Sequence, residues 1–285
     1  MAVVTGANSG IGEQVAMALA AMGATTVLAC RDAERGAAAA RRVAAYAASD
    51  AVAAVALDLA DLDSVRRAAA TIATTWGRVD VLVNNAGAMS TRRQTTAQGF
   101  EQTFGVNHLG HFYLTGQLLD VLAASAPARI VNVSSVAHRL APRGLRWRDL
   151  QHRRRYWGIT AYGHSKLANL LFTRGLAARL DPAAVTANAV HPGPVRTSFG
   201  LDGDARGIVG VVNHLIRPFE LDAREGADTV IFLAVDPSVA GCTGGYWWRR
   251  RQIMPSRAAR DDRQVQRLWS VSEQLLADAG YPYGR

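Results

Sequence analysis

The chain has 285 residues, 49% of them hydrophobic, and a formal net charge of +9. That length can bury a substantial core, the two cysteines (Cys30 and Cys242) exclude a disulfide-rich scaffold, and no apolar run reaches the roughly 20 residues of a membrane span. Because the start also lacks the basic region of a signal peptide, we expect one cytoplasmic domain over residues 1–285 with no membrane span.

Strand-like apolar runs alternate with helical stretches along the chain. Strands are expected at 2–5, 25–29, 51–57, 79–83, 129–133, 185–190 and 245–248. Apolar residues recur at helical spacing from Ile11 to Met22, and further helices are expected at about 33–47, 61–76 and 162–180. This alternation predicts the α/β class, with a doubly wound (Rossmann) parallel sheet of about seven strands and helices on both faces.

Two segments, 136–160 and 198–220, show no regular periodicity. In doubly wound folds the ligand lies beyond the carboxyl ends of the strands, where such insertions gather. We therefore expect both segments to shape the substrate site. The first of them is basic and aromatic, with Trp147, Tyr156 and Trp157 among its residues.

The turn after the first strand reads Thr5-Gly-Ala-Asn-Ser-Gly-Ile-Gly12. Its glycines permit a tight turn and a close approach of the backbone to a phosphate, and the next helix offers free N–H groups to a pyrophosphate. An ordinary turn could contain the same glycines, but their position between strand and helix favours a dinucleotide site. The predicted cofactor contacts in this turn are Gly6, Asn8, Ser9, Gly10, Ile11 and Gly12.

The end of the second strand bears on the choice of cofactor. An acidic residue in place of Cys30 would bind the ribose 2′-hydroxyl of NAD, whereas here the position is neutral and Arg31 follows. Arginine can bind a 2′-phosphate, so NADP(H) is favoured over NAD(H). The alternative is a surface arginine that pairs with Asp32.

Two later strand ends complete the expected nucleotide site. Asp58 and Leu59 follow the third strand and could flank the adenine. After the fourth strand, Asn85, Ala86 and Gly87 include the small residues expected where the backbone passes under a cofactor. We therefore predict that all five residues contact the nucleotide.

Lys166 is the single lysine among 32 lysine and arginine residues, and it lies four residues after Tyr162. A helix places residues i and i+4 on one face. The ammonium group would stabilise a phenolate and lower the tyrosine pKa from its usual value of about 10. Tyr162 could then exchange a proton with a substrate oxygen near neutral pH. Arginine cannot copy a compact ammonium group, so a chemical role is predicted for Lys166.

Together these motifs resemble the short-chain dehydrogenase/reductase family, and the resemblance covers nearly the whole chain. It rests on the glycine turn, Asn84-Asn-Ala-Gly87, Asn107, Val133-Ser-Ser135, Tyr162-x-x-x-Lys166 and Pro192-Gly193. Within the family the chain is most similar to the retinol-dehydrogenase-like branch, through the segments 28–32, 106–112, 164–169, 190–193 and 268–274.

The resemblance implies a catalytic set of Asn107, Ser135, Tyr162 and Lys166. Ser135 would bind the substrate oxygen, and Tyr162 would be the acid in reduction and the base in oxidation. Lys166 would hold the nicotinamide-ribose hydroxyls, and Asn107 would position a water that relays protons. Ser134 competes with Ser135 for its role, but the motif alignment favours Ser135 and turns Ser134 toward the sheet.

The family pattern extends to the nicotinamide end of the cofactor and to assembly. It implies cofactor contacts from Tyr162 and Lys166 and from a later turn that contains Pro192, Gly193, Val195 and Thr197. Helices near 109–124 and 162–180 form the usual dimer surface in relatives, so a homodimer or homotetramer is expected.

We therefore expect an NADP(H)-dependent oxidoreductase that interconverts a bulky hydrophobic ketone or aldehyde and its alcohol, working mainly as a carbonyl reductase. The Ala- and Arg-rich composition is typical of GC-rich genomes, and similar bacterial proteins include ketoreductases of aromatic polyketides. An aromatic polyketide ketone is thus one hypothetical substrate. The alternatives are a cofactor-sensing regulator, which would not need Ser135, Tyr162 and Lys166 together, and a scaffold protein.

The remaining features have simpler interpretations. Dense arginine runs such as 153–155 are interpreted as solvated faces, so no nucleic-acid partner is expected, while a membrane-surface or anionic-substrate role stays open. His108 and His111 are interpreted as packing residues, and no metal site is expected. Trp247 and Trp248 should face opposite sides of a strand rather than stack on bases.

Overall fold

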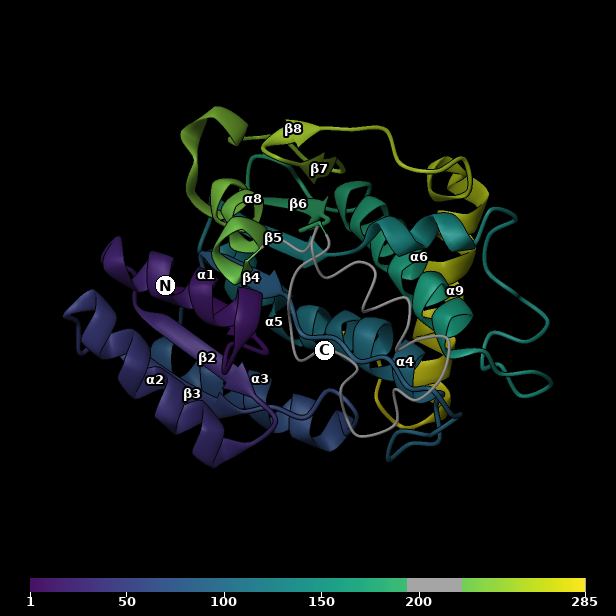
Figure 1. Cartoon of the computed structure of the whole chain (residues 1–285), viewed down its shortest axis with the longest axis horizontal. Coiled ribbons are helices and arrows are strands. Elements are labelled where there is room, and N and C mark those ends of the chain that lie inside the picture. Colours follow the sequence, from purple (N-terminus) through teal and green to yellow (C-terminus); the bar gives the residue numbers. More distant parts are fainter. Residues whose placement is uncertain (194–221, 285) are drawn as a thin grey trace.

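A twisted sheet runs through the centre of the protein (Figure 1), in a computed structural model that describes residues 1–193 and 222–284. The strands are β1 (Ala2–Thr5), β2 (Thr26–Cys30), β3 (Val52–Ala56), β4 (Val81–Asn84), β5 (Ala128–Val133), β6 (Val185–Val190), β7 (Tyr246–Trp248) and β8 (Arg251–Gln252). Their order is β3-β2-β1-β4-β5-β6-β7-β8, and every pairing is parallel except that of β7 with β8. The predicted doubly wound sheet is confirmed, with eight strands in the described part rather than about seven.

The additional strand, β8, has only two residues, and both are exposed. Such a short polar pair has no alternating apolar pattern, so the sequence contains no strand signal at this point. Arg249 and Arg250 adopt φ angles of 47° and 59° and turn the chain back, so that β8 pairs antiparallel with β7. The segment 198–220 and the predicted contacts Val195 and Thr197 lie outside the described residues.

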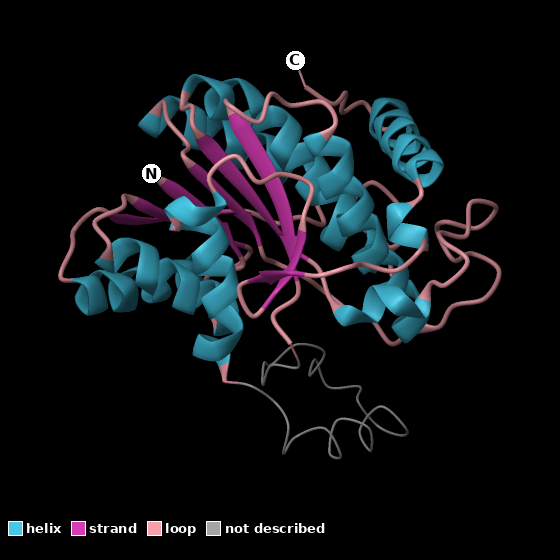
Figure 2. Ribbon diagram, turned by 90° about the horizontal axis from the view of Figure 1, so that it is seen from above, coloured by secondary structure: helices cyan, strands magenta, loops and turns pink. Residues whose placement is uncertain are grey.

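Helices cover both faces of the sheet, as Figure 2 shows from above. One face carries α1 (Gly10–Ala21), α2 (Ala33–Ala47) and α8 (Ala223–Val235). The other carries α3 (Leu62–Trp76), α5 (His111–Ala124) and α6 (Gly158–Ala177), with α9 (Asp262–Asp278) packed on α6. The shorter segments are α4 (Gln102–Phe104), the π-helix η1 (Gly105–Gly110), and the 3-10 turns η2 (Val136–Leu140), η4 (Pro237–Val239) and η5 (Ala258–Arg260).

The alternation of strand side chains builds one apolar core on each face of the sheet. Val3 faces the core under α3, α5 and α6, whereas Ala2 and Val4 face the core under α1, α2 and α8. Strands buried on both faces are expected in a parallel sheet. The strand order reverses between β1 and β4, and folds of this class bind their ligands at that reversal.

Helix α6 begins at Gly158, four residues before the start that the sequence predicted. A Cβ atom at Gly158 would clash with the carbonyl oxygen of Ser90. Glycine therefore lets the segment 136–160 dock on the stretch that follows β4. This contact brings the two segments together beside the carboxyl ends of the strands.

Candidate active site

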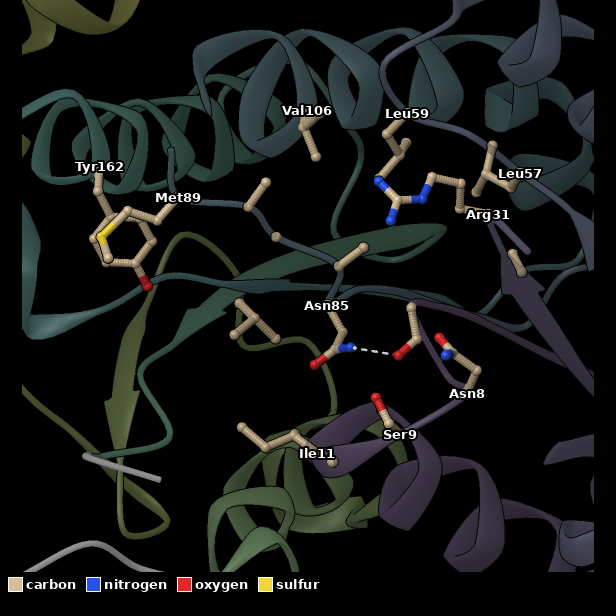
Figure 3. A pocket seen from close by; sticks show the side chains of 18 of the residues that line it. Asn8, Ser9, Ile11, Arg31, Leu57, Leu59, Asn85, Met89, Val106 and Tyr162 are labelled. Atoms are coloured by element: carbon tan, nitrogen blue, oxygen red, sulfur yellow. Dashed lines mark hydrogen bonds between the residues drawn. The ribbon is translucent and has the colours of Figure 1, made fainter. Parts of the chain in front are cut away.

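A cavity of about 530 Å³ lies where the strand order reverses. Figure 3 shows Arg31 and Tyr162 at opposite ends of it. The predicted residues that line it are Gly6, Asn8, Ser9, Gly10, Ile11, Gly12, Arg31, Asp58, Leu59, Asn85, Ala86, Gly87, Ser135, Tyr162, Lys166, Pro192 and Gly193. Among the predicted residues that the structure describes, Asn107 is the one that does not line the cavity.

The glycine turn has the shape of a phosphate cradle. Gly6 and Gly10 have φ angles of +65° and +58°, and a Cβ atom on Gly12 would lie 2.5 Å from the Gly6 carbonyl oxygen. Ser9 precedes α1 but its side chain makes no cap hydrogen bond. The N–H groups of the first turn of α1 are thus left for an anion, which the helix dipole also favours. These features fit the pyrophosphate of a dinucleotide.

The end of the cavity after β2 is lined by two arginines, Arg31 and Arg35, and by the carboxylates of Asp32 and Asp58. The Asp32 carboxylate accepts the backbone N–H of Arg35 over 2.9 Å and so caps α2. No ion pair joins Arg31 to Asp32 in the described part of the chain. Arg35 lines the same cavity as Arg31. The sequence reasoning missed Arg35, although its i+4 spacing from Arg31 was a usable signal.

Thr5, at the end of β1, forms hydrogen bonds with the residues that follow β4. Its hydroxyl accepts the backbone N–H groups of Asn85 over 2.9 Å and of Ala86 over 3.0 Å, while the Asn85 amide donates to the Thr5 carbonyl over 2.8 Å. His111 Nδ1 lies 3.1 Å from the Asn107 carbonyl oxygen and therefore carries the proton. Its Nε2, 3.0 Å from the Thr5 hydroxyl, is then the acceptor. This network fixes the floor of the cavity.

Asn107 lies in the π-helix η1, fully buried. Its Oδ1 accepts the backbone N–H of Ala88 over 2.6 Å, and its Nδ2 donates to the Ala88 carbonyl and to Ser165 Oγ over 2.9 Å each. Single π-helical turns are frequent at functional sites. These bonds hold the chain after β4 against α6, which is a positioning role. The proton-relay water at Asn107 stays a prediction.

Ser135, Tyr162 and Lys166 meet at the other end of the cavity. Tyr162 and Lys166 share one face of α6, and Nζ of Lys166 lies 5.6 Å from the Tyr162 ring centroid. Lys166 is 3% exposed, and its ammonium group donates to the Val133 carbonyl over 3.0 Å. Ser134 turns away and donates to the Lys166 carbonyl over 2.8 Å, whereas Ser135 hydrogen-bonds Tyr162.

The pKa values differ from the simple expectation that Lys166 lowers the pKa of Tyr162. Burial raises the pKa of the Tyr162 phenol to about 12, and its hydrogen bond with Ser135 only partly offsets this effect. Burial also lowers the pKa of Lys166 to about 8. Desolvation disfavours both charged forms, and it is the largest cause of the shift in each pKa. Tyr162 is therefore held as a proton donor in this state of the site.

Comparison with known proteins agrees with this geometry. A model of the short chain dehydrogenase family matches residues 1–146. Retinol dehydrogenase 12 from Mus musculus is 42% identical over 274 residues, which cover 96% of this chain and 85% of the relative. The chain belongs to the short-chain dehydrogenase/reductase family. A solved protein from Mycobacterium paratuberculosis is similar to this reductase-family chain with 35% identity and a TM-score of 0.77, over 100% of this chain and 94% of that one.

Solved short-chain dehydrogenase/reductase neighbours hold either nicotinamide cofactor. Pseudomonas aeruginosa RhlG, in a complex with NADP, is 29% identical with a TM-score of 0.67, over 86% of this chain and 92% of that one. A 3-ketoacyl-(acyl-carrier-protein) reductase from Brucella melitensis, in a complex with NADH, is 25% identical with a TM-score of 0.65, over 86% and 94% of the two chains. This family member is therefore an oxidoreductase whose fold binds a nicotinamide cofactor.

The cavity of this short-chain dehydrogenase/reductase is also lined by residues that sequence reasoning missed. The cavity wall also includes Met89, Ser90, Gln94, Gln102 and Val106. Met89, Ser90 and Gln94 come from the irregular stretch after β4, in which no periodicity marks a site, whereas Gln102 lies in α4 and Val106 in η1. A partly buried hydrogen bond holds the stretch after β4, because the Tyr156 hydroxyl donates to the Ser90 carbonyl over 3.0 Å.

Several histidines of this family member are buried or hydrogen-bonded within the fold. His108 and His111 are buried, and His191 Nδ1 accepts the backbone N–H of Gly193 over 3.2 Å. Within residues 1–193 and 222–284, no group of three or more His, Cys, Asp or Glu side chains could hold a metal ion. In the same residues, no helix has both the length and the apolar character to cross a bilayer. Trp247 is buried and Trp248 exposed, as expected for opposite sides of a strand.

Proposed function

We propose that this protein is an NADP(H)-dependent carbonyl reductase that reduces a bulky hydrophobic ketone or aldehyde to its alcohol. The observation that supports this most directly is the placement of Ser135, Tyr162 and Lys166 at one end of the cavity whose other end is the glycine turn. A nucleotide bound along the cavity would bring its nicotinamide beside these side chains. When bound, that nucleotide supplies the hydride.

Each side chain has a proposed role at the substrate oxygen. Tyr162, kept protonated by burial, donates its proton as the oxygen gains negative charge. Ser135 donates a hydrogen bond to the same oxygen and orients it. Lys166 holds the ribose hydroxyls and places positive charge near the phenolate that Tyr162 becomes. Asn107 keeps α6 and the backbone at Ala88 in register.

The preference for NADP(H) is proposed from the adenosine end. Arg31 and Arg35 line the cavity after β2, and the nearby carboxylate of Asp32 is already engaged as the cap of α2. Two guanidinium groups can bind a 2′-phosphate. A residue that would select the bare ribose hydroxyl of NAD is replaced by the buried Cys30.

The substrate class is proposed from the cavity wall and from the relatives. Met89 and Val106 add apolar surface to the cavity wall, and similar proteins include retinol dehydrogenases. An aromatic polyketide ketone remains a second hypothesis for the substrate. A panel of retinoids, steroids and aromatic polyketide ketones distinguishes the two, and turnover of retinoids and steroids alone would reject the polyketide.

The test is NADPH and NADH oxidation with that panel, with Tyr162→Phe as the matched variant. We expect turnover by the wild type with NADPH and a loss of about 10²-fold or more in the variant, with nucleotide affinity retained. Nucleotide binding without turnover of any carbonyl would instead favour a cofactor-sensing regulator. We also propose that the protein is cytoplasmic, which is consistent with its free cysteines Cys30 and Cys242. We further propose a homodimer or homotetramer, which light scattering can check.

A further inference from the structure

Positive charge is concentrated at one edge of the protein. The segments 139–157 and 257–267 contain eleven arginines and three aspartates, a net charge of +8, while the whole chain has +9. All eleven arginines are exposed. The sequence shows only short, separate arginine runs, so their concentration becomes visible only when the two segments are placed in the fold.

Contacts join the two segments into one surface, which we call the basic edge. The Arg267 guanidinium lies 4.6 Å from the ring centroid of Trp147, and the Leu145 backbone N–H donates to Gln264 over 3.2 Å. Both segments lie at the right-hand side of the molecule in Figure 1. A hollow at this junction is lined by Arg143, Arg257, Arg260 and Arg263.

The three aspartates of the basic edge do not neutralise it. Asp262 pairs with Arg174 outside the two segments, over 2.6 Å, and Asp261 contacts Arg263 at 3.3 Å. Asp149 accepts the backbone N–H groups of the loop at 153–154. Among the described residues, no carboxylate lies within ion-pair distance of the other ten arginines of the basic edge. The surface therefore attracts an anionic partner.

Large apolar side chains stand exposed beside these arginines. Val136, Leu140, Trp157, Ile159 and Met254 are each between 51% and 67% exposed. The structure also ties Arg139 to the Met254 carbonyl and places the Arg155 guanidinium 5.0 Å from the Trp157 ring centroid. Exposed apolar side chains gathered with positive charge indicate an interaction surface.

The position of the apolar residues relates this surface to the candidate active site. Val136 directly follows Ser135, and Ile159 lies on the first turn of α6, one turn before Tyr162. Two of the exposed apolar residues are therefore close in the chain to Ser135 and Tyr162, which line the cavity.

We propose that the basic edge docks on an anionic lipid bilayer, with the exposed apolar side chains inserted at the level of the headgroups. Arginines near an anionic surface each add to the binding, and an amphipathic surface with tryptophan and aliphatic residues enters the interface. Single-stranded nucleic acid would instead call for several stacking platforms, whereas four of the five exposed side chains are aliphatic or Met. The surface binds the bilayer without spanning it.

The test measures sedimentation of the full chain with vesicles of phosphatidylcholine, with and without about one third phosphatidylserine. We expect binding to the anionic vesicles that exceeds binding to the neutral ones at least about tenfold at low salt, and that weakens as salt rises. Equal binding to both vesicles, or none to the anionic ones while single-stranded DNA binds, would overturn the proposal. No substrate is needed, so this result is separate from the fate of the proposed activity.

Variants localise the effect. The triple variant Arg143→Gln, Arg257→Gln, Arg260→Gln should lose about tenfold or more of its affinity for anionic vesicles. The control triple Arg41→Gln, Arg67→Gln, Arg224→Gln removes the same charge from exposed residues on α2, α3 and α8 and should bind nearly as the wild type does. An equal loss in both triples would show attraction by net charge alone and reject a defined surface.

A second pair of changes tests insertion. Trp157→Ser combined with Met254→Ser removes two exposed apolar side chains and leaves the arginines in place. We expect this variant to bind anionic vesicles several-fold more weakly than the wild type does. The difference should persist at high salt, where charge is screened. Unchanged binding at high salt would overturn the insertion of these side chains.

Discussion

The Lys166 ammonium group donates to the Val133 carbonyl oxygen over 3.0 Å, which ties α6 to the end of β5 beneath the candidate active site. This bond fixes the only lysine of the sequence where one compact cation fits. The surroundings leave the residue 3% exposed. A side chain of another shape at this position must therefore displace packed neighbours.

Lys166→Arg should abolish most of the activity. The planar guanidinium group is larger and needs several acceptors, and it cannot make the single bond to Val133 without moving Tyr162 or the strand end. We expect kcat/KM to fall by about 10²-fold or more in steady-state carbonyl reduction. The exposed exchange Arg41→Lys is the control. Wild-type activity in Lys166→Arg would show that the lysine is incidental.

Lys166 should also make stability depend on alkaline pH. Its pKa is lowered to about 8 in the fold from a usual value near 10.5, because burial disfavours the charge. Between these values the unfolded chain binds more protons, so the contribution of Lys166 to stability rises with pH across that window, by up to about 3 kcal/mol. Urea unfolding of the wild type and Lys166→Met at about pH 7 and pH 10 measures this. A pH-independent difference between the two proteins would contradict it.

Buried histidines should make the protein sensitive to acid. Burial lowers the pKa of His108 to about 3 and those of His111, His164 and His191 to about 4. The unfolded chain protonates near pH 6.5, so each histidine destabilises the fold as pH falls from about 6.5, by about 1.4 kcal/mol per pH unit. Urea unfolding at about pH 7.5, 6.5 and 5.5 should show this loss. His108→Met should reduce the dependence of the unfolding free energy on pH by the contribution of about one proton. An unchanged dependence would reject the assignment to His108.

Arg31→Asp should reverse the cofactor preference. The carboxylate would repel a 2′-phosphate and could accept a hydrogen bond from a ribose 2′-hydroxyl. We expect the Kd for NADPH to rise by about 10- to 100-fold while that for NADH stays or falls. Fluorescence titration of both nucleotides measures it. Arg41→Asp, a similar change of charge outside the cavity, is the control, and an equal loss for both nucleotides in Arg31→Asp would contradict the 2′-phosphate contact.

His138 should act as a positioning residue for Ser135. Its Nδ1 lies 2.7 Å from the Ser135 carbonyl oxygen and donates to it, while Nε2 accepts the Ser256 backbone N–H over 3.1 Å. His138→Phe removes both bonds and should lower kcat by about tenfold with a smaller change in KM. His138→Asn, which can keep one bond, should recover part of kcat. A loss confined to thermal stability would indicate a purely structural role.

Local sequence patterns predicted much of the fold and the glycine turn of the candidate nucleotide site. The strands 2–5 and 185–190 and the helix 33–47 appear with the predicted bounds, because side-chain periodicity is set by the backbone itself. The glycine turn and the Tyr162–Lys166 pair are also local, so their spacing already indicates a phosphate cradle and a shared helix face. In contrast, β8 has two polar residues and no pattern to read.

What the sequence determined by itself is therefore the order of elements, the glycine turn and the set of candidate reactive side chains, since each depends on neighbours a few positions away. Only the tertiary structure decided how distant residues meet. It joined His138 to Ser256, brought Met89 and Val106 to the cavity, and gathered the arginines of the basic edge. It also decided the direction of the pKa shifts of Tyr162 and Lys166, because burial is a sum over all packed neighbours, whatever their position in the chain.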